Sequence, residues 1–124
     1  MKNLQEVVRA SWNIDTTSSP DEWDAQTAPE RGQCVPTALL VQDYLGGDLE
    51  RLATEFNGAR ETHYRNVVNG EVVDLTRDQY PDDQQFTPAP VEGDVREYVL
   101  GNENTRDRYI RLSLRAALLM QLQD

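Results

Sequence analysis

The order of hydrophobic and polar positions predicts four helices along this chain. Residues 2–11 have an amphipathic helical pattern, and residues 34–45 repeat apolar side chains at helical spacings before a pair of glycines ends the run. Residues 95–100 fit a short helix, and residues 105–122 fit a long final one. We therefore expect helices near both ends of the chain and one in its first half.

The same patterning predicts a small antiparallel sheet. Two β-rich stretches, 62–68 and 71–76, flank Asn69-Gly70, the dipeptide favoured in a type I′ hairpin turn. A further short strand is expected at 49–54. Helices on an antiparallel sheet of three or more strands make the predicted fold class α+β, in a single domain over residues 1–124.

Three segments without periodicity are expected to connect these elements. The first is a long polar loop that reaches Arg31, and the second is an exposed link through Asn57-Gly58. The third, residues 81–93, is rich in Pro and acidic residues and could form a flap over a cleft.

Cys34, the only cysteine, is predicted to lie at a helix N-terminus, because Pro36 is tolerated only in a first helical turn. Unpaired backbone N–H groups and the positive end of the helix dipole favour an anion there, which lowers a thiol pKa. The same N–H groups could stabilise an oxyanion on an attacked carbonyl. The position therefore suits a nucleophilic cysteine, although a lone cysteine is often only a small buried hydrophobe.

His63, the only histidine, and Asp74 lie on the two strands of the predicted hairpin. With Asn69-Gly70 as the turn they become diagonal neighbours at roughly 7 Å on one sheet face, within reach of a side-chain contact. Arg65 lies directly opposite Asp74 in this register, so an ordinary cross-strand ion pair competes with the His-Asp pair. Both pairings remain open from the sequence.

These three side chains provide the roles of a thiol nucleophile site. Cys34 would attack a carbonyl, His63 would move the proton, and Asp74 would orient the imidazole. Gln33 could donate a side-chain N–H to the oxyanion. Two tryptophans of the long polar loop, Trp12 and Trp23, could line a substrate cleft or could equally anchor that loop to the core.

Several of these segments together resemble a known family. They are residues 32–34, the helix through 41–44 with the following glycines, the His63-Tyr64-Arg65-Asn66 segment, and residues 74–79. This combination resembles the small bacterial YunG-like family from about Trp12 into the C-terminal helix. More remotely, Cys at a helix start, His on a strand and Asp on the next strand is similar in order to papain-like and transglutaminase-like proteins. That resemblance implies a papain-like core, with the Cys helix packed on the sheet and a C-terminal helix.

Composition excludes several functions. The net charge of −10 argues against nucleic acid, because phosphate binding rests on clustered Lys and Arg. One Cys and one His make zinc improbable, no cofactor motif is present, and no membrane-length apolar run exists. A single Cys is consistent with a reducing cytoplasm. Four arginines near the C-terminus are expected to form the solvated face of the last helix: Arg106, Arg108, Arg111 and Arg115.

The sequence therefore predicts a thiol-dependent acyl-transfer enzyme, an amidase or peptidase, a deamidase or a transferase. Its substrate would be an amide or thioester, carried by a small molecule or by a peptide or protein. The alternative is a catalytically inactive papain-like scaffold that binds a peptide or small molecule.

Overall fold

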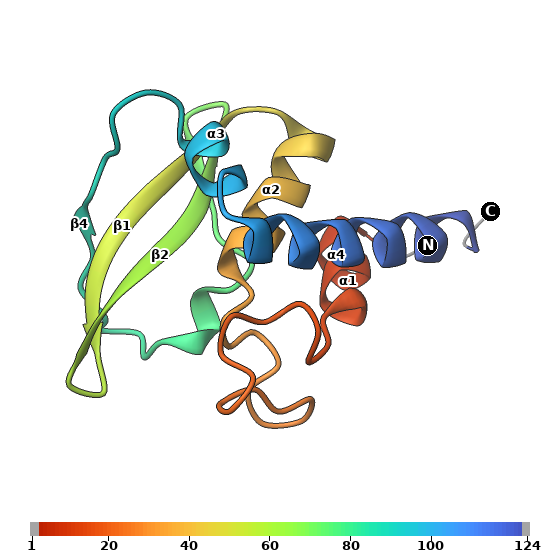
Figure 1. The fold of residues 1–124 in the computed structure, drawn as a ribbon, viewed down its shortest axis with the longest axis horizontal. Helices are drawn as coiled ribbons and strands as arrows, with labels where there is room; N and C mark the ends of the chain where they lie inside the picture. Colours follow the sequence, from red (N-terminus) through yellow and green to blue (C-terminus); the bar gives the residue numbers. More distant parts are fainter. Residues whose placement is uncertain (1–2, 123–124) are drawn as a thin grey trace.

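The computed structural model describes residues 3–122, in which helices gather beside one antiparallel sheet (Figure 1). The fold class is α+β, as predicted. The elements in chain order are α1 (Leu4–Ser11), α2 (Cys34–Leu45), β1 (Asp48–Phe56), β2 (Ala59–Val68), β3 (Glu71–Val73), the 3₁₀ turn η1 (Arg77–Gln79), β4 (Thr87–Pro88), α3 (Val95–Leu100) and α4 (Glu103–Gln121). The four predicted helices are all present. No helix among the described residues is long and apolar enough to cross a membrane.

The sheet has the strand order β3-β2-β1-β4, and its pairs are antiparallel. The predicted hairpin at Asn69-Gly70 is confirmed, with positive φ angles of 53° and 80°. Asn57-Gly58 makes an equivalent two-residue turn between β1 and β2, with φ angles of 52° and 78°. The expected link is exposed, but it is a hairpin turn that was not predicted from the sequence, although this dipeptide has the same turn preference as Asn69-Gly70.

The segment 81–93 is not entirely a loop. Its residues Thr87–Pro88 form β4, which pairs with Leu52 and Ala53 at the free edge of β1. The backbone N–H of Ala89 also donates to the Arg51 carbonyl at 3.0 Å. A proline is tolerated in this edge position, because it donates no hydrogen bond to the sheet. The segment thus lies across the sheet edge as a strap (Figure 1).

β3 ends at Val73, three residues before the predicted end at Thr76. The chain turns there because Asp74 Oδ1 accepts from the backbone N–H of Thr76 at 3.3 Å and from its hydroxyl at 3.4 Å. Since β3 pairs only with residues 66–68 of β2, residues 61–65 have no strand partner on that side. The segments 31–34 and 77–80 lie against this part of β2.

α2 packs on the sheet face that carries Leu49 and Tyr64. Asn66 shares that face, and its Nδ2 donates to the Ala38 carbonyl of α2 at 2.9 Å. Side-chain alternation then places His63 on the opposite face. The Cys helix therefore packs on the sheet face opposite to the one that carries His63, because the alternate residues of β2 supply the apolar contacts to α2.

The main hydrophobic cluster joins α1, α2 and α4. Its buried members are Val7, Val8, Trp12, Leu40, Leu112 and Ala116. Trp12 donates its indole N–H to Thr37 Oγ1 at 2.8 Å, and the Arg9 guanidinium lies over its ring. Trp12 therefore anchors the start of the long loop in the core, which corrects its assignment to a cleft wall.

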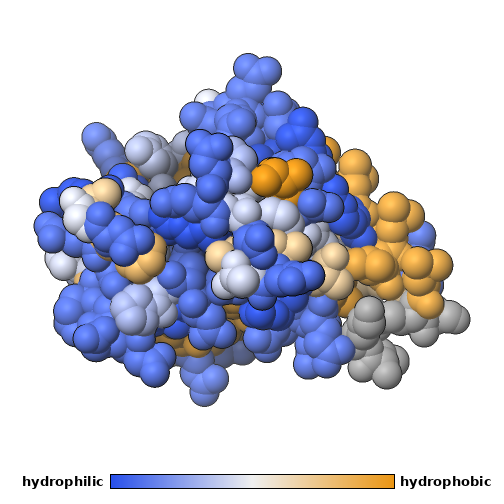
Figure 2. All heavy atoms as spheres, turned by 90° about the horizontal axis from the view of Figure 1, so that it is seen from below, coloured by the Kyte–Doolittle hydropathy of each residue, from blue (hydrophilic) through white to orange (hydrophobic). Residues whose placement is uncertain are grey.

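The solvated face of α4 also differs from the expectation. Arg108 is buried, and Arg115 is directed at the 11–15 segment, where it donates to the Ser11 carbonyl at 2.7 Å and to Asp15. Arg106 and Arg111 are exposed as expected. Four apolar side chains of α4 and its C-terminal end are exposed as well: Ile110, Leu114, Leu118 and Leu122. Figure 2 shows hydrophobic surface at the end of the molecule where the last turns of α4 lie. Paired arginines can face inward, so charge alone did not identify the outer face.

Candidate active site

His63 and Asp74 are hydrogen-bonded side chains. His63 Nε2 lies 2.7 Å from Asp74 Oδ2, and the histidine is fully buried. A carboxylate accepts hydrogen bonds, so this contact places the neutral ring's hydrogen on Nε2. The other nitrogen, Nδ1, is buried and makes no standard hydrogen bond within residues 3–122. The histidine is thus oriented with one nitrogen fixed and the other available as a base.

Arg65 does not compete for Asp74. Its Nε donates to Glu50 Oε1 at 2.5 Å, across the β1–β2 pair rather than across the β2–β3 hairpin. Because β3 has already ended at Val73, Asp74 leaves the position opposite Arg65 and turns toward His63. Of the two pairings left open by the sequence, the structure contains the His-Asp pair.

Cys34 lies at the first residue of α2, as predicted, and is 9% exposed. It is close enough to His63 to influence the imidazole. Burial of His63 favours its neutral form, but the hydrogen bond with Asp74 and the hydrogen bonding and charge of Cys34 outweigh this and raise the pKa of His63 to about 9. The three predicted side chains therefore form one electrostatic unit. Their catalytic roles stay a prediction.

Aromatic rings surround His63 on its face of the sheet. Tyr80 meets the imidazole edge-on with ring centroids 5.2 Å apart, and Phe86 of the strap lies at 5.2 Å. Tyr80 in turn contacts Phe56 and Phe86. The segment that was expected to close over a cleft thus places a ring directly against the histidine, and these rings exclude water from it.

An ion network centred on the buried Arg31 lies beside Cys34. Both terminal nitrogens of Arg31 bind the Glu61 carboxylate, with Nη1 at 2.8 Å from Oε1, and Arg31 Nε donates to Glu22 at 2.9 Å. The Tyr80 hydroxyl donates to Glu61 at 3.0 Å. This chain of contacts ties the segment before Cys34 to β2 and to the tyrosine that packs on His63. Arg31, Glu61 and Tyr80 were not predicted as site residues.

A pocket of about 230 Å³ opens at Cys34. Its lining residues are Ser18, Ser19, Arg31, Gly32, Cys34, Glu61, Thr62, Gln79 and Tyr80. Most of these side chains are polar and several carry hydrogen-bond donors. Neither Trp12 nor Trp23 is among them, and the Trp23 indole N–H donates instead to the Pro29 carbonyl at 2.8 Å. The cleft-wall assignment is therefore wrong for Trp23 as well, because its ring holds the long loop together.

Gln33 precedes the helix and is fully buried. Its Nε2 donates to the Asn13 carbonyl at 3.1 Å, while its Oε1 has no partner within residues 3–122. The side chain does not line the pocket at Cys34. No side chain caps α2, so its first backbone N–H groups are the nearer oxyanion donors. An oxyanion role for Gln33 stays a prediction.

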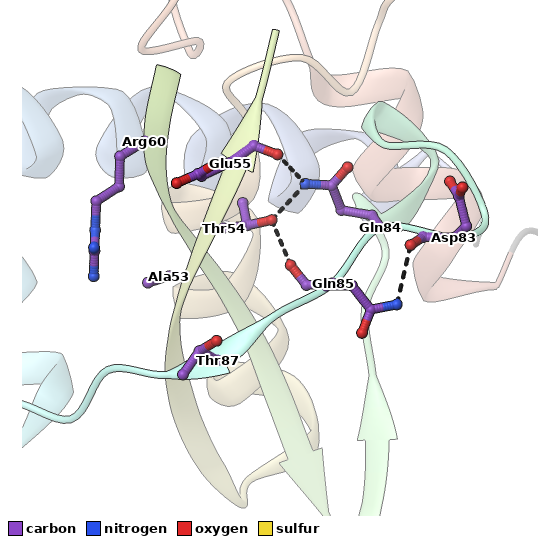
Figure 3. A pocket seen from close by; sticks show the side chains of 8 residues that line it. All are labelled: Ala53, Thr54, Glu55, Arg60, Asp83, Gln84, Gln85 and Thr87. Atoms are coloured by element: carbon purple, nitrogen blue, oxygen red, sulfur yellow. Dashed lines mark hydrogen bonds between the residues drawn. The ribbon is translucent and has the colours of Figure 1, made fainter. Parts of the chain in front are cut away.

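The largest pocket, about 620 Å³, lies elsewhere (Figure 3). It is formed between β1 and the strap and contains none of the three candidate residues. Its polar groups already bind one another: Gln84 Nε2 donates to Thr54 Oγ1 and to the Glu55 carbonyl, and the Thr54 hydroxyl donates to the Gln85 carbonyl. These contacts attach the strap to β1. Of the three candidate residues, Cys34 lines the smaller pocket and none lines this one.

No group of three or more His, Cys, Asp or Glu residues within the described part of the chain is placed to hold a metal ion.

Gly32 shapes the approach to Cys34, and its replacement by Ala is expected to destabilise the fold by about 2–4 kcal/mol. Its φ is +74°, and an added Cβ would collide with Thr17 Oγ1 and crowd the backbone of Ser18 and Ser19. Denaturant unfolding of Gly32→Ala measures the cost. Gly58→Ala is the matched control, since Gly58 has a similar φ of +78° and open space around it. Equal losses in the two variants would mean that the contact with Thr17 is unimportant.

Comparison with known proteins gives a family but no activity. A family model described as YunG protein matches residues 1–121. The chain is also 30% identical over 94 residues to a protein of Bacillus subtilis (strain 168) described as "Uncharacterized protein YunG", and the match covers 74% of this chain and 75% of that protein. The YunG-like resemblance is thus confirmed. No solved structure matches the chain, so the papain-like resemblance rests on residue order.

Proposed function

The chain belongs to the YunG family, and for this member we propose a cysteine-dependent acyl-transfer activity in which Cys34 is the nucleophile, His63 the general base and acid, and Asp74 the orienting carboxylate. The observation that carries the proposal is the His63–Asp74 hydrogen bond of 2.7 Å, which leaves Nδ1 unbonded in a site shared with Cys34. A purely structural histidine of this burial would be expected to satisfy both nitrogens.

The proposed reaction has two halves. In the first, the Cys34 proton passes to His63 Nδ1 and the sulfur forms a bond to the substrate carbonyl carbon. The tetrahedral oxyanion is held by first-turn N–H groups of α2. The bond to the leaving amine or thiol then breaks, and His63 returns the proton to that group. In the second half, water or an amine gives a proton to His63 and attacks the acyl-cysteine, which releases the acid or a new amide.

Asp74 restricts this proton exchange to one nitrogen of the His63 ring. Its hydrogen bond holds Nε2–H, so Nδ1 alone exchanges protons, and its negative charge stabilises the imidazolium between the two halves. The three possible reactions differ in one small molecule. Water is the acceptor in hydrolysis, an amine is the acceptor in transfer, and ammonia is the product that leaves in deamidation. The papain-like character of the core belongs to the same proposal and is supported by the order Cys at a helix start, His on a strand and Asp after the next turn.

The proposal is tested by the reactivity of Cys34 with iodoacetamide. Because it is the only cysteine, mass spectrometry counts its alkylation directly. We expect labelling of the folded protein at neutral pH, and a rate at least about tenfold lower in His63→Ala, since the imidazole no longer stabilises the attacking sulfur.

Arg65→Ala is the control for this experiment, because Arg65 lies two residues from His63 and contacts neither Asp74 nor Cys34. It should label at the rate of the unchanged chain. A cysteine that reacts only after unfolding would contradict the proposal. That result would favour the binding-module alternative, for which the 9% exposure of Cys34 is the supporting observation.

A further inference from the structure

The chain contains two buried arginines with opposite surroundings. Arg31, 9% exposed, binds the carboxylates of Glu22 and Glu61. Arg108, 6% exposed, has no carboxylate partner within residues 3–122, in a chain that carries 22 acidic side chains. Burying a guanidinium without an anion is costly, and Arg31 shows how this fold meets that cost elsewhere.

The direct contacts of Arg108 are neutral and incomplete. Its Nε donates to Asn104 Oδ1 at 2.8 Å and its Nη2 to Thr105 Oγ1 at 3.2 Å. Nη1 is buried and has no partner within residues 3–122. Burial lowers the pKa of Arg108, and the charge of Cys34 acts in the opposite direction, so the guanidinium lies within electrostatic range of the candidate nucleophile.

A second pocket is lined by a hydrogen-bond partner of Arg108 and by the chain neighbour of Cys34, although neither Arg108 nor Cys34 is itself among its lining residues. It measures about 470 Å³ and is lined by Val35, Tyr64, Tyr98, Val99, Gly101, Asn102 and Thr105. Thr105 is the residue that holds the Arg108 guanidinium, and Val35 directly follows Cys34 in the first turn of α2. The Tyr64 hydroxyl accepts from Arg51 Nε at 3.1 Å, which leaves its own proton free to donate. The pocket thus combines apolar walls with donors.

We propose that this pocket is a carboxylate-binding subsite, in which Arg108 receives a negatively charged group of the acyl substrate attacked by Cys34. The inference rests on the proposed function and adds a substrate class to it: amides or thioesters that carry a carboxylate. One guanidinium with neutral neighbours balances a single negative charge, so a carboxylate suits the subsite better than a doubly charged phosphate. An anion delivered to Arg108 would also complete the hydrogen bonding of Nη1.

Two alkylating agents of similar size test the subsite, because iodoacetate carries a carboxylate and iodoacetamide does not. We expect iodoacetate labelling of Cys34 to saturate with concentration. In Arg108→Met the ratio of the iodoacetate rate to the iodoacetamide rate should fall by about tenfold or more, and the ratio cancels any change in the reactivity of the sulfur itself. Arg111→Met, an exposed arginine one turn along α4, removes the same charge and should leave the ratio unchanged. Equal ratios in the unchanged chain and Arg108→Met would overturn the proposal.

Propionate binding provides a second measurement that does not require a reactive cysteine. At constant ionic strength propionate should raise the Tm of the unchanged chain and should not raise that of Arg108→Met. If Arg108→Met does not fold, Arg108→Lys replaces it and should bind propionate more weakly, since lysine lacks the planar fork. A Tm of the unchanged chain that does not respond to propionate would overturn the subsite. A cysteine inert to both reagents, with the propionate effect intact, would instead remove the proposed activity and leave the subsite standing.

Discussion

Replacing Asp74 by Asn is expected to slow turnover and Cys34 alkylation by about 10²-fold with the fold preserved. The amide has nearly the size of the carboxylate, but its nitrogen is a donor. It can therefore hold His63 with the hydrogen on Nδ1, the nitrogen that must accept the proton from the thiol. The change also removes the negative charge that favours the imidazolium.

An NMR titration of the sole histidine measures this effect without a substrate. In the unchanged chain His63 should titrate with a pKa of about 9, because its partners Asp74 and Cys34 favour the imidazolium. In Asp74→Asn the pKa should be lower, because a hydrogen bond and a charge that raise it are lost while burial, which lowers it, remains. Cys34→Ser should also lower it, since Cys34 is the second partner.

The result that would remove Asp74 from the site is an unchanged His63 titration in Asp74→Asn. Arg65→Ala is the comparison, and its histidine should titrate as in the unchanged chain, because Arg65 binds Glu50. All variants are titrated over the same pH range with the same probe.

Replacing Arg31 by Met is expected to cost about 3 kcal/mol of unfolding free energy. It leaves the Glu61 carboxylate, with 20% of its side chain exposed, without its main partner. The double variant Arg31→Met, Glu61→Gln should recover part of the loss, because no unpaired charge then remains. Urea unfolding of the single and double variants measures the coupling between Arg31 and Glu61. Arg60→Met is the control, because Arg60 is an exposed arginine next to Glu61 on β2.

The loss of stability in acid is an independent test of the Arg31–Glu61 ion pair. The hydrogen bond from Arg31 lowers the pKa of Glu61 below its ordinary value of 4.5. A carboxylate whose pKa is lower in the folded state than in the unfolded state stabilises the fold. This stabilisation is complete above the pKa of the unfolded state and is lost as the pH falls through the pKa of the folded state. The unchanged chain should therefore lose stability below about pH 4.5, and Arg31→Met should lose less over that window. Parallel acid profiles of the two proteins would contradict the assignment.

Local patterns in the sequence predicted most of the scaffold. Apolar spacing gave the helix at 34–45 with its observed bounds, and Asn69-Gly70 gave the β2–β3 turn, because both signals depend on neighbouring residues. The contact between His63 and Asp74 followed from the register of that turn. The hydrogen bond that anchors Trp12 could not be predicted in this way, since its partner Thr37 lies 25 residues away in the chain.

The parts that were missed depend on distant contacts. Tyr80 and Phe86 become neighbours of His63 only because β3 stops early and the strap crosses to β1. The end of β3 has a local cause in the Asp74–Thr76 turn, whereas the crossing of the strap has no local signal. Glu61 did carry a detectable signal, because it lies two residues before His63 and therefore shares its sheet face. The inward position of Arg108 had none, since a charged residue in a long helix normally faces water.

The early end of β3 leaves backbone groups of residues 61–65 in β2 without a strand partner on one side. An unpaired strand of this kind is a template on which a second chain can add a strand and begin to aggregate. Here the side chains of Arg31 and Tyr80 bind Glu61 and keep their segments beside this part of β2. The ion network beside Cys34 should therefore also hinder self-association, and its loss should appear as concentration-dependent aggregation before the helices unfold.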